Sequence, residues 1–321
     1  MTLPKQWVVQ HKLKHQAIVT AHVQKTGALL IKPFKLEDEL WRVPLNIDSL
    51  TPAMLTREAI GLYVMGADEI EFHAKYITSQ QRSHIRSLMQ TLVGFEIIDE
   101  SVSKVIARNI FDVRKFPLSA TIQKIFLIAE AMITDALRVT LKKDQQLAHD
   151  ITERDLEIDK LLLILRRQFN TILQDKVSEE ELDSDRINLG YFQNIAVQLE
   201  RIADHGVKIA AARNLAIQQQ SKLSDSIAHQ EIFKTLCRIL NESATMVQRV
   251  DKQHAHQVLD ANSELEESLQ HIRSKTKRPS PSEIIVVDSL DRSRGYLMNI
   301  AELTIDHSMN RYIQAIVLKV G

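Results

Sequence analysis

The sequence contains little glycine, proline, cysteine or aromatic side chain. Of its 321 residues, 8 are glycine, 7 are proline and 1 is cysteine, and aromatic residues make up 5%. So few turn-forming residues argue against an all-β fold, which needs a turn after each strand. The single cysteine, Cys237, excludes an intramolecular disulfide and a cysteine-ligated metal cluster, as expected for a reducing compartment. The composition therefore predicts a mainly α protein of the cytoplasm.

The motifs of several enzyme classes are also missing. The glycines are too scattered to form GxGxxG or a Walker loop, and the sequence has no GxSxG or HExxH. The N-terminus has no signal-peptide pattern, and the most apolar run, residues 125–133, is short and contains Glu130. We therefore expect neither a membrane-spanning helix nor an enzyme.

Positive and negative charges balance over the whole chain but not at its start. Lys plus Arg and Asp plus Glu number 41 each, so no overall field attracts nucleic acid. Residues 1–35, in contrast, contain six lysines and no arginine or acidic residue. Such a segment can bind phosphates electrostatically, and its candidate DNA contacts are Lys5, Lys12 and Lys14. The surrounding VVQHKLKHQ shows no base-reading motif.

The first third of the chain alternates between strand and helix patterns. Residues 3–8 (LPKQWV) predict a short helical turn, and residues 17–33 predict two strands around Lys25-Thr26-Gly27. A small α+β module then follows, with two helices, a strand between them and a closing hairpin. The expected elements are a helix ending at Gly66, a strand at 68–72, a helix at 79–92, and strands at 95–100 and 104–111. We place a partial β segment at 1–50 and the α+β module at 51–116.

Beyond Pro117 the pattern is helical and repeats once. Apolar residues at three- and four-residue spacing predict helices at about 118–142, 145–175 and 187–217. The pattern recurs at about 226–249, 250–274 and 283–318, and LERIADHGVKIA (199–210) aligns without gaps with LDRSRGYLMNIA (290–301). Short connections between long helices predict two tandem three-helix bundles, at 117–220 and 221–321.

Two pairs of carboxylates lie one helical turn apart on consecutive predicted helices. Asp155 and Asp159 form the first pair, and Glu200 and Asp204 form the second. A helical wheel places all four away from the centre of the apolar stripe, where the two pairs can converge between adjacent helices. Four convergent carboxylates bind a hard or borderline cation, although a single DxxxD is usually solvated surface. His205 and Arg166 or Arg167 could complete or balance this site.

The second bundle repeats the pattern less well. Asp260 and Glu264 have the right spacing, and Asp291 aligns with Glu200, but Gly295 stands where the first bundle has Asp204. We therefore predict one full metal site and one degraded site. A ferritin-like dimetal oxidase is disfavoured, because none of the 12 histidines has a glutamate three residues before it.

These motifs resemble a known family. RDLEIDKLLLILRRQ (154–168) and LERIADHGVKIA look like the PhoU family of phosphate-uptake regulators. Upstream, EAIGLYVMGADEIEF (58–72), residues 81–101 and the LPKQWV opening resemble archaeal members that carry an AbrB/SpoVT-like N-terminal segment. Such segments normally begin with a strand before the LPK turn. Met1 falls almost on that turn, so we expect a truncated segment.

The resemblance implies a function that spacing alone did not show. PhoU proteins bind clusters of divalent or trivalent metal ions, such as iron or zinc, through E/DxxxD motifs, and restrain import through the phosphate ABC transporter. By this match the first-site ligands are Asp155, Asp159, Glu200 and Asp204, and the degraded second site has Asp260, Glu264 and Asp291. Expected partners are transporter subunits or a phosphate-signalling protein, met at the membrane periphery without insertion. AbrB-like segments also imply a homodimer.

Alternatives from other functional classes stay open at this stage. The main alternative is a phosphate-responsive, AbrB-type transcription regulator that uses residues 1–50 on DNA. A metal-dependent enzyme and a helical scaffold whose carboxylates bind nothing are the others.

Overall fold

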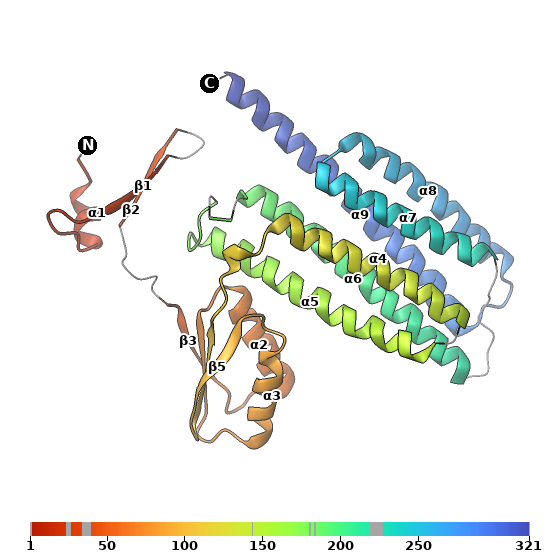
Figure 1. The fold of residues 1–321 in the computed structure, drawn as a ribbon, viewed down its shortest axis with the longest axis horizontal. Helices are drawn as coiled ribbons and strands as arrows, with labels where there is room; N and C mark the ends of the chain where they lie inside the picture. The colour runs from red at the N-terminus through yellow and green to blue at the C-terminus, as the bar shows by residue number, and fades with distance from the viewer. Residues whose placement is uncertain are drawn as a thin grey trace. The chain divides into compact units, whose positions relative to one another are not determined.

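The computed structural model describes residues 2–23, 27–33, 40–142, 144–179, 181–182, 184–218 and 227–320. The chain divides into two compact units, residues 1–41 and 42–321, and each is described by itself. Figure 1 shows the course of the chain through both units.

The first unit consists of one short helix and a two-stranded hairpin. Helix α1 (Lys5–Gln10) follows Pro4, and strands β1 (Val19–Val23) and β2 (Leu29–Pro33) pair antiparallel, with Val23 opposite Leu29. The predicted helical turn and strand pair are confirmed, while Lys25 and Thr26 of the predicted turn lie outside the described residues. No described side chain of this unit is buried. A two-stranded hairpin without a buried face is marginally stable in water.

The second unit begins with a two-layer α+β module. Its sheet has the strand order β3-β4-β6-β5, in which β3 and β4 are parallel and the other neighbours are antiparallel. Thr51 and Thr78 cap the two helices by accepting hydrogen bonds from Met54 N and Gln81 N. The elements are β3 (Arg42–Asn46), α2 (Pro52–Val64), β4 (Glu69–His73), α3 (Ser79–Met89), β5 (Phe95–Glu100) and β6 (Lys104–Asn109).

Strand β3 was absent from the sequence prediction. Its sequence RVPLN is short and contains Pro44, which weakens any strand signal. The proline is tolerated because β3 is an edge strand that pairs only with β4 in this sheet. The strand lies within the range 1–50 and completes the sheet of the following module.

The remaining helices form the two sets of three mutually packed helices that the sequence predicted as tandem three-helix bundles. Within the first set α4, α5 and α6 pack on one another, and α7, α8 and α9 do the same. Figure 1 shows α5 and α8 on opposite sides of the bundle. No helix in the described ranges is both long and apolar enough to cross a lipid bilayer. The bounds are α4 (Leu118–Lys142), α5 (Gln145–Leu173), α6 (Arg186–Gln218), α7 (Ile227–Arg249), α8 (Lys252–Lys275) and α9 (Pro281–Val320), with a 3₁₀ turn, η1 (Val113–Lys115), before α4.

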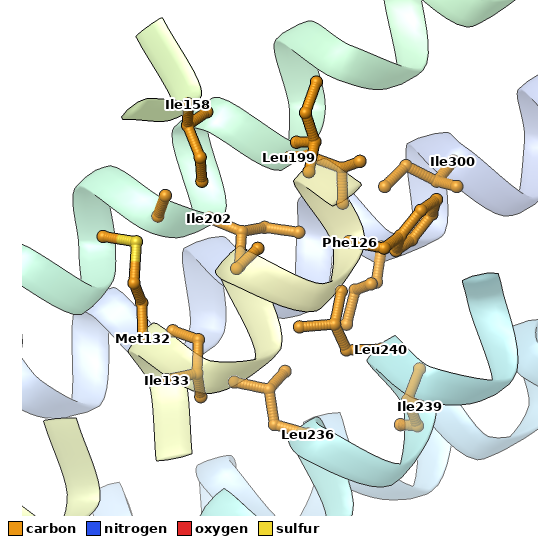
Figure 2. Packing of buried hydrophobic residues seen from close by; sticks show 14 of the residues in the cluster. Phe126, Met132, Ile133, Ile158, Leu199, Ile202, Leu236, Ile239, Leu240 and Ile300 are labelled. Carbon is orange, nitrogen blue, oxygen red and sulfur yellow. The ribbon is translucent and has the colours of Figure 1, made fainter. Parts of the chain in front are cut away.

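The two sets of helices share one hydrophobic core. Helix α6 packs on α9 and α4 packs on α7, so apolar residues of both repeats belong to one buried cluster. Figure 2 shows Phe126 of α4, Leu240 of α7 and Ile300 of α9 in this cluster. Burying one such side chain contributes about 1.5–3 kcal/mol, so the joint core is a major source of stability.

The internal repeat is visible where α6 meets α9. His205 and Tyr296 occupy equivalent positions in the gapless alignment, and their ring centroids lie 5.9 Å apart. Nearby, Asn299 donates a hydrogen bond to Gln198 Oε1 over 3.0 Å. Equivalent faces of the two repeats therefore pack against each other.

A buried arginine fastens the α+β module to the bundle. Arg167 of α5 is 2% exposed and donates hydrogen bonds to Tyr63 O (2.6 Å) and Ala67 O (2.9 Å), at the end of α2. Its guanidinium also lies 5.1 Å from the centroid of the Tyr63 ring. Lys176 adds a hydrogen bond to Gly66 O over 2.7 Å. Helix α5 therefore belongs to the bundle and supports the module as well.

We expect Gly206→Ala to stabilise the protein. A Cβ at Gly206 of α6 would meet its nearest atoms, in Met132 and Ile133 of α4, at 3.6–3.7 Å, which is ordinary van der Waals distance. Alanine in a helix interior is favoured over glycine by about 1 kcal/mol. The urea midpoint of unfolding should therefore rise.

Gly94→Ala is the matched control. Gly94 has φ +86°, and a Cβ there would overlap the Phe111 side chain, so this variant should be destabilised. A fall in midpoint for Gly206→Ala as large as that for Gly94→Ala would contradict the packing between α4 and α6.

Candidate metal centre

The structure brings the four predicted carboxylates of the first bundle into one neighbourhood. Asp155 and Asp159 lie on α5, and Glu200 and Asp204 lie on α6, which packs along it (Figure 1). All four are partly buried. Residues four apart lie on one helical face, so each helix presents its pair to the same groove. We call the groove between these four residues the α5–α6 carboxylate groove.

Burial and neighbouring negative charges raise the pKa of Asp155, Asp159 and Glu200. Burial raises the pKa of Asp155 from 3.8 to about 6, with further contributions from the charges of Asp159 and Asp204. Burial, followed by the charge of Asp204, also raises the pKa of Asp159 and of Glu200. The groove thus concentrates negative charge without neutralising it.

Nearby cations compensate this charge only in part. Lys208 lies 3.9 Å from Asp204 on the same helix and lowers the pKa of Asp155 slightly. Arg166 acts in the same direction on Asp159 and Glu200. Even so, Asp155 Oδ1 is buried without a hydrogen-bond partner. An oxygen-rich groove with an unsatisfied buried carboxylate oxygen fits a hard or borderline cation.

The groove is not a preformed chelate. Within the part of the chain that the structure describes, no three His, Cys, Asp or Glu side chains are arranged to hold a metal ion. The four carboxylates affect one another electrostatically but do not surround a common point. A cation would have to draw these side chains together by rotation about their χ angles.

Of the three accessory residues expected, only Arg166 is placed to balance the groove. Arg167 is turned to the α+β module, as described above. His205 lies beside Tyr296 of α9, and burial lowers its pKa to about 4. The sequence could not distinguish Arg166 from Arg167, because adjacent residues lie about 100° apart on a helix and only the packing shows which side faces the module.

The second bundle neutralises its carboxylate with arginines instead. Asp260 and Glu264 are exposed on α8, while Asp291 of α9 accepts hydrogen bonds from Arg273 and Arg294, each over 3.0 Å. Burial opposes ionisation of Asp291, but the hydrogen bonds from Arg294 and Arg273 outweigh it and lower its pKa. Its charge is already satisfied by protein groups.

Sequence reasoning missed the role of Arg294. In the gapless alignment Arg294 stands opposite Ala203, so a residue-by-residue comparison of the two repeats contained the signal. Arg294 also lies 3.2 Å from Glu266 of α8. One substitution thus brings a cation into the position where the first repeat has only a methyl group.

The predicted DNA-contact lysines belong to the first unit. Lys5, Lys12 and Lys14 are exposed, and Lys12 follows α1 with φ 50°. Their side chains are therefore accessible to a polyanion.

Comparison with known proteins finds a family match within the first set of helices. Residues 122–212 match the family model of the PhoU domain. The matched segment runs from α4 to α6 and includes all four carboxylates of the groove.

Two solved structures are similar to the chain. PhoU from Pseudomonas aeruginosa has 18% identity and a TM-score of 0.49, over 59% of this chain and 93% of its own. The phosphate transport system regulatory protein PhoU from Streptococcus pneumoniae has 16% identity and a TM-score of 0.49, over 59% and 91%. No curated protein matches the chain. The mainly α fold expected from the sequence, with two sets of three helices after a small α+β region, is confirmed by the structure, and the match to the PhoU domain lies in the first set.

Without metal, the groove should make stability fall as pH rises. Between its ordinary pKa of 3.8 and its folded pKa of about 6, Asp155 holds a proton in the folded state that the unfolded state has lost. Protonation therefore stabilises the fold at low pH, and this contribution is lost as pH rises through about 6. The unfolding free energy of wild type relative to Asp155→Asn should decrease between about pH 4 and pH 7.

The measurement is urea unfolding of chelator-treated protein at several pH values. Asp260→Asn, which removes an exposed carboxylate of α8, is the matched control. An unfolding free energy of wild type relative to Asp155→Asn that stays constant or increases from about pH 4 to pH 7 would contradict the raised pKa of Asp155.

Proposed function

We propose that this protein is a non-enzymatic regulator of phosphate uptake that acts through its metal-binding PhoU domain. One observation carries the proposal: the segment that matches the PhoU domain is also the bundle with the uncompensated carboxylate groove. The partners are subunits of the phosphate ABC transporter or an associated phosphate-signalling protein. The protein would meet them from the cytoplasm, at the membrane periphery, and as a homodimer.

The proposed cofactor is a divalent or trivalent metal ion such as iron or zinc. Bound in the groove, the ion would balance the negative charge of four carboxylates, which nearby cations compensate only in part. These carboxylates belong to Asp155, Asp159, Glu200 and Asp204. The orphaned Asp155 Oδ1 supports this choice, since a buried carboxylate oxygen without a partner is costly. Asp291 already has two arginine partners, which favours one full site over two.

The groove residues would control the relative position of α5 and α6. In the apo state the four carboxylates repel one another across the helix–helix interface. Ligation would draw the pairs together and make the outer face of the bundle more rigid. Metal and phosphate together could brace these helices and so change the face that is offered to a transporter subunit.

We expect loss of the groove carboxylates to abolish both metal content and regulation. The test variant combines Asp155→Asn, Asp159→Asn, Glu200→Gln and Asp204→Asn. In cells that lack their own regulator, wild type should restrain uptake of radiolabelled phosphate and the variant should not. The same proteins, purified without chelator or affinity-tag metal, should contain stoichiometric metal and none, respectively, by mass spectrometry.

The control variant carries Asp260→Asn and Glu264→Gln and should behave as wild type in both measurements. Circular dichroism shows whether the quadruple variant remains helical. If wild type contains no metal and still restrains uptake, the metal has no part in the mechanism. If wild type contains metal and does not affect uptake, the proposed regulatory role is wrong.

A second candidate is an AbrB-type DNA-binding regulator. The observation that favours it is the exposure of Lys5, Lys12 and Lys14 on the first unit, whose residues 1–35 include no acidic residue. Such a unit would hold the phosphate backbone, and its affinity would fall steeply with salt.

For this candidate we expect salt-sensitive retention of duplex DNA that Lys12→Glu and Lys14→Glu together abolish. Each lost phosphate contact should also reduce the slope of log affinity against log salt by about 0.9. A gel-shift titration at several salt concentrations measures both effects. Retention that is unchanged in the double variant would exclude this unit as the DNA-binding element.

A further inference from the structure

The α+β module contains a pocket that the proposed function does not use. Its volume is about 350 Å³, which falls within the range of small-molecule sites. Leu50, Pro52 and Leu55 supply its apolar side chains. The other lining residues are polar or aromatic: Asp48, Tyr76, Thr78, Gln80, Gln81 and His84. The pocket lies in a different domain from the carboxylate groove.

The strand topology explains why a pocket forms here. Strands β3 and β4 are parallel neighbours, and each is followed by a loop that leads into a helix. The crevice at the carboxyl ends of parallel strands is the usual ligand position in α/β sheets. Asp48 and Leu50 lie in the loop after β3, and Tyr76 and Thr78 lie in the loop after β4.

Two lining residues of α3 make hydrogen bonds to neighbouring elements. The Gln81 side-chain amide donates to Ile47 O over 3.2 Å, which joins α3 to the loop after β3. His84 Nε2 and Thr56 Oγ1 share a hydrogen bond of 2.8 Å between α3 and α2. These bonds already engage part of the polar lining of the pocket.

Asp48 gives the pocket its charge. Among the nine described residues that line it, Asp48 is the only carboxylate, and no lysine or arginine accompanies it. Its Oδ1 accepts a hydrogen bond from Lys75 N over 2.9 Å, which joins the two loops. That bond uses one of the two carboxylate oxygens, so the carboxylate keeps further acceptor capacity.

Tyr76 contributes an aromatic ring to the same pocket. It follows Lys75 directly, and it is 64% exposed although it lines the pocket. A pocket that contains both a carboxylate and an accessible aromatic ring suits a guanidinium or ammonium group, because the carboxylate pairs with the charge and the ring attracts the cation. The apolar side of the pocket can then cover a short aliphatic stem.

We infer that this pocket binds a small organic cation, a guanidinium or ammonium group on an aliphatic stem. The group can belong to a free small molecule or to a basic side chain of another protein. Its binding would be sensed by α2, whose first turns line the pocket and whose C-terminal end is held by Arg167 of α5. The inference stands apart from the metal proposal and shares no residue with it.

The experiment compares matched probes by calorimetric titration of the full chain. Butylguanidinium carries the charge, and butylurea has the same shape without it. A blocked Gly-Arg-Gly peptide presents the same group on a protein-like backbone. We expect saturable binding of butylguanidinium or of the peptide, and none of butylurea.

Three variants test whether the cation binds in this pocket. Asp48→Asn removes the charge but keeps an oxygen that can accept from Lys75 N, so it should fold normally and weaken binding by about tenfold or more. Tyr76→Leu should also weaken binding. Asp99→Asn removes an exposed carboxylate of β5 outside the pocket and should leave binding unchanged.

The binding results test the inference and distinguish the two possible sources of the cation. Tighter binding of the peptide than of butylguanidinium, lost in Asp48→Asn, would identify a protein side chain as the ligand. Binding of butylguanidinium at least as tight as that of the peptide, also lost in Asp48→Asn, would identify a free small molecule. The inference fails if neither cation binds, if butylurea binds equally well, or if Asp48→Asn binds as tightly as wild type.

Discussion

The packing of α6 is the constraint on which the rest of the structure depends. This helix contacts α4, α5 and α9 at once, and its apolar residues belong to the core that these helices share. Its partly buried acidic residues lie where it meets α5. These residues are Glu200 and Asp204 of the carboxylate groove. The core that joins the repeats thus also decides where a metal site can be.

Helix α5 links the two parts of the second unit. One segment carries Asp155 and Asp159 on the groove, and the following segment carries Leu163 and Arg167 under the α+β module. Because Arg167 is buried and its hydrogen bonds go to backbone carbonyls, the module is held at a defined position on this helix. Helix α5 thus contacts the module through one segment and carries the groove carboxylates on the segment before it.

The two repeats differ in how far nearby cations compensate the charge of their carboxylates. In the first repeat the buried carboxylates lack enough cationic partners, and their pKa values rise. In the second, Arg273 and Arg294 pair with Asp291 and its pKa falls. Carboxylates that protein cations have already neutralised attract a metal ion less strongly. The repeat with unpaired carboxylates is also the one that matches the PhoU domain.

The sequence by itself determined the helices, the repeat and the four groove carboxylates, because apolar spacing and residue type are local properties. It did not reveal β3, because the proline in this short segment weakens the strand pattern. The strand is stabilised by its parallel pairing with β4. Only the tertiary structure shows that Arg167 donates hydrogen bonds to the α+β module, whereas Arg166 lies near the groove carboxylates. It also shows that Arg273 of α8 donates a hydrogen bond to Asp291 of α9. Both depend on which elements pack together, and so does the pocket between the loops after β3 and β4. Such contacts join residues distant in sequence, and no local pattern records them.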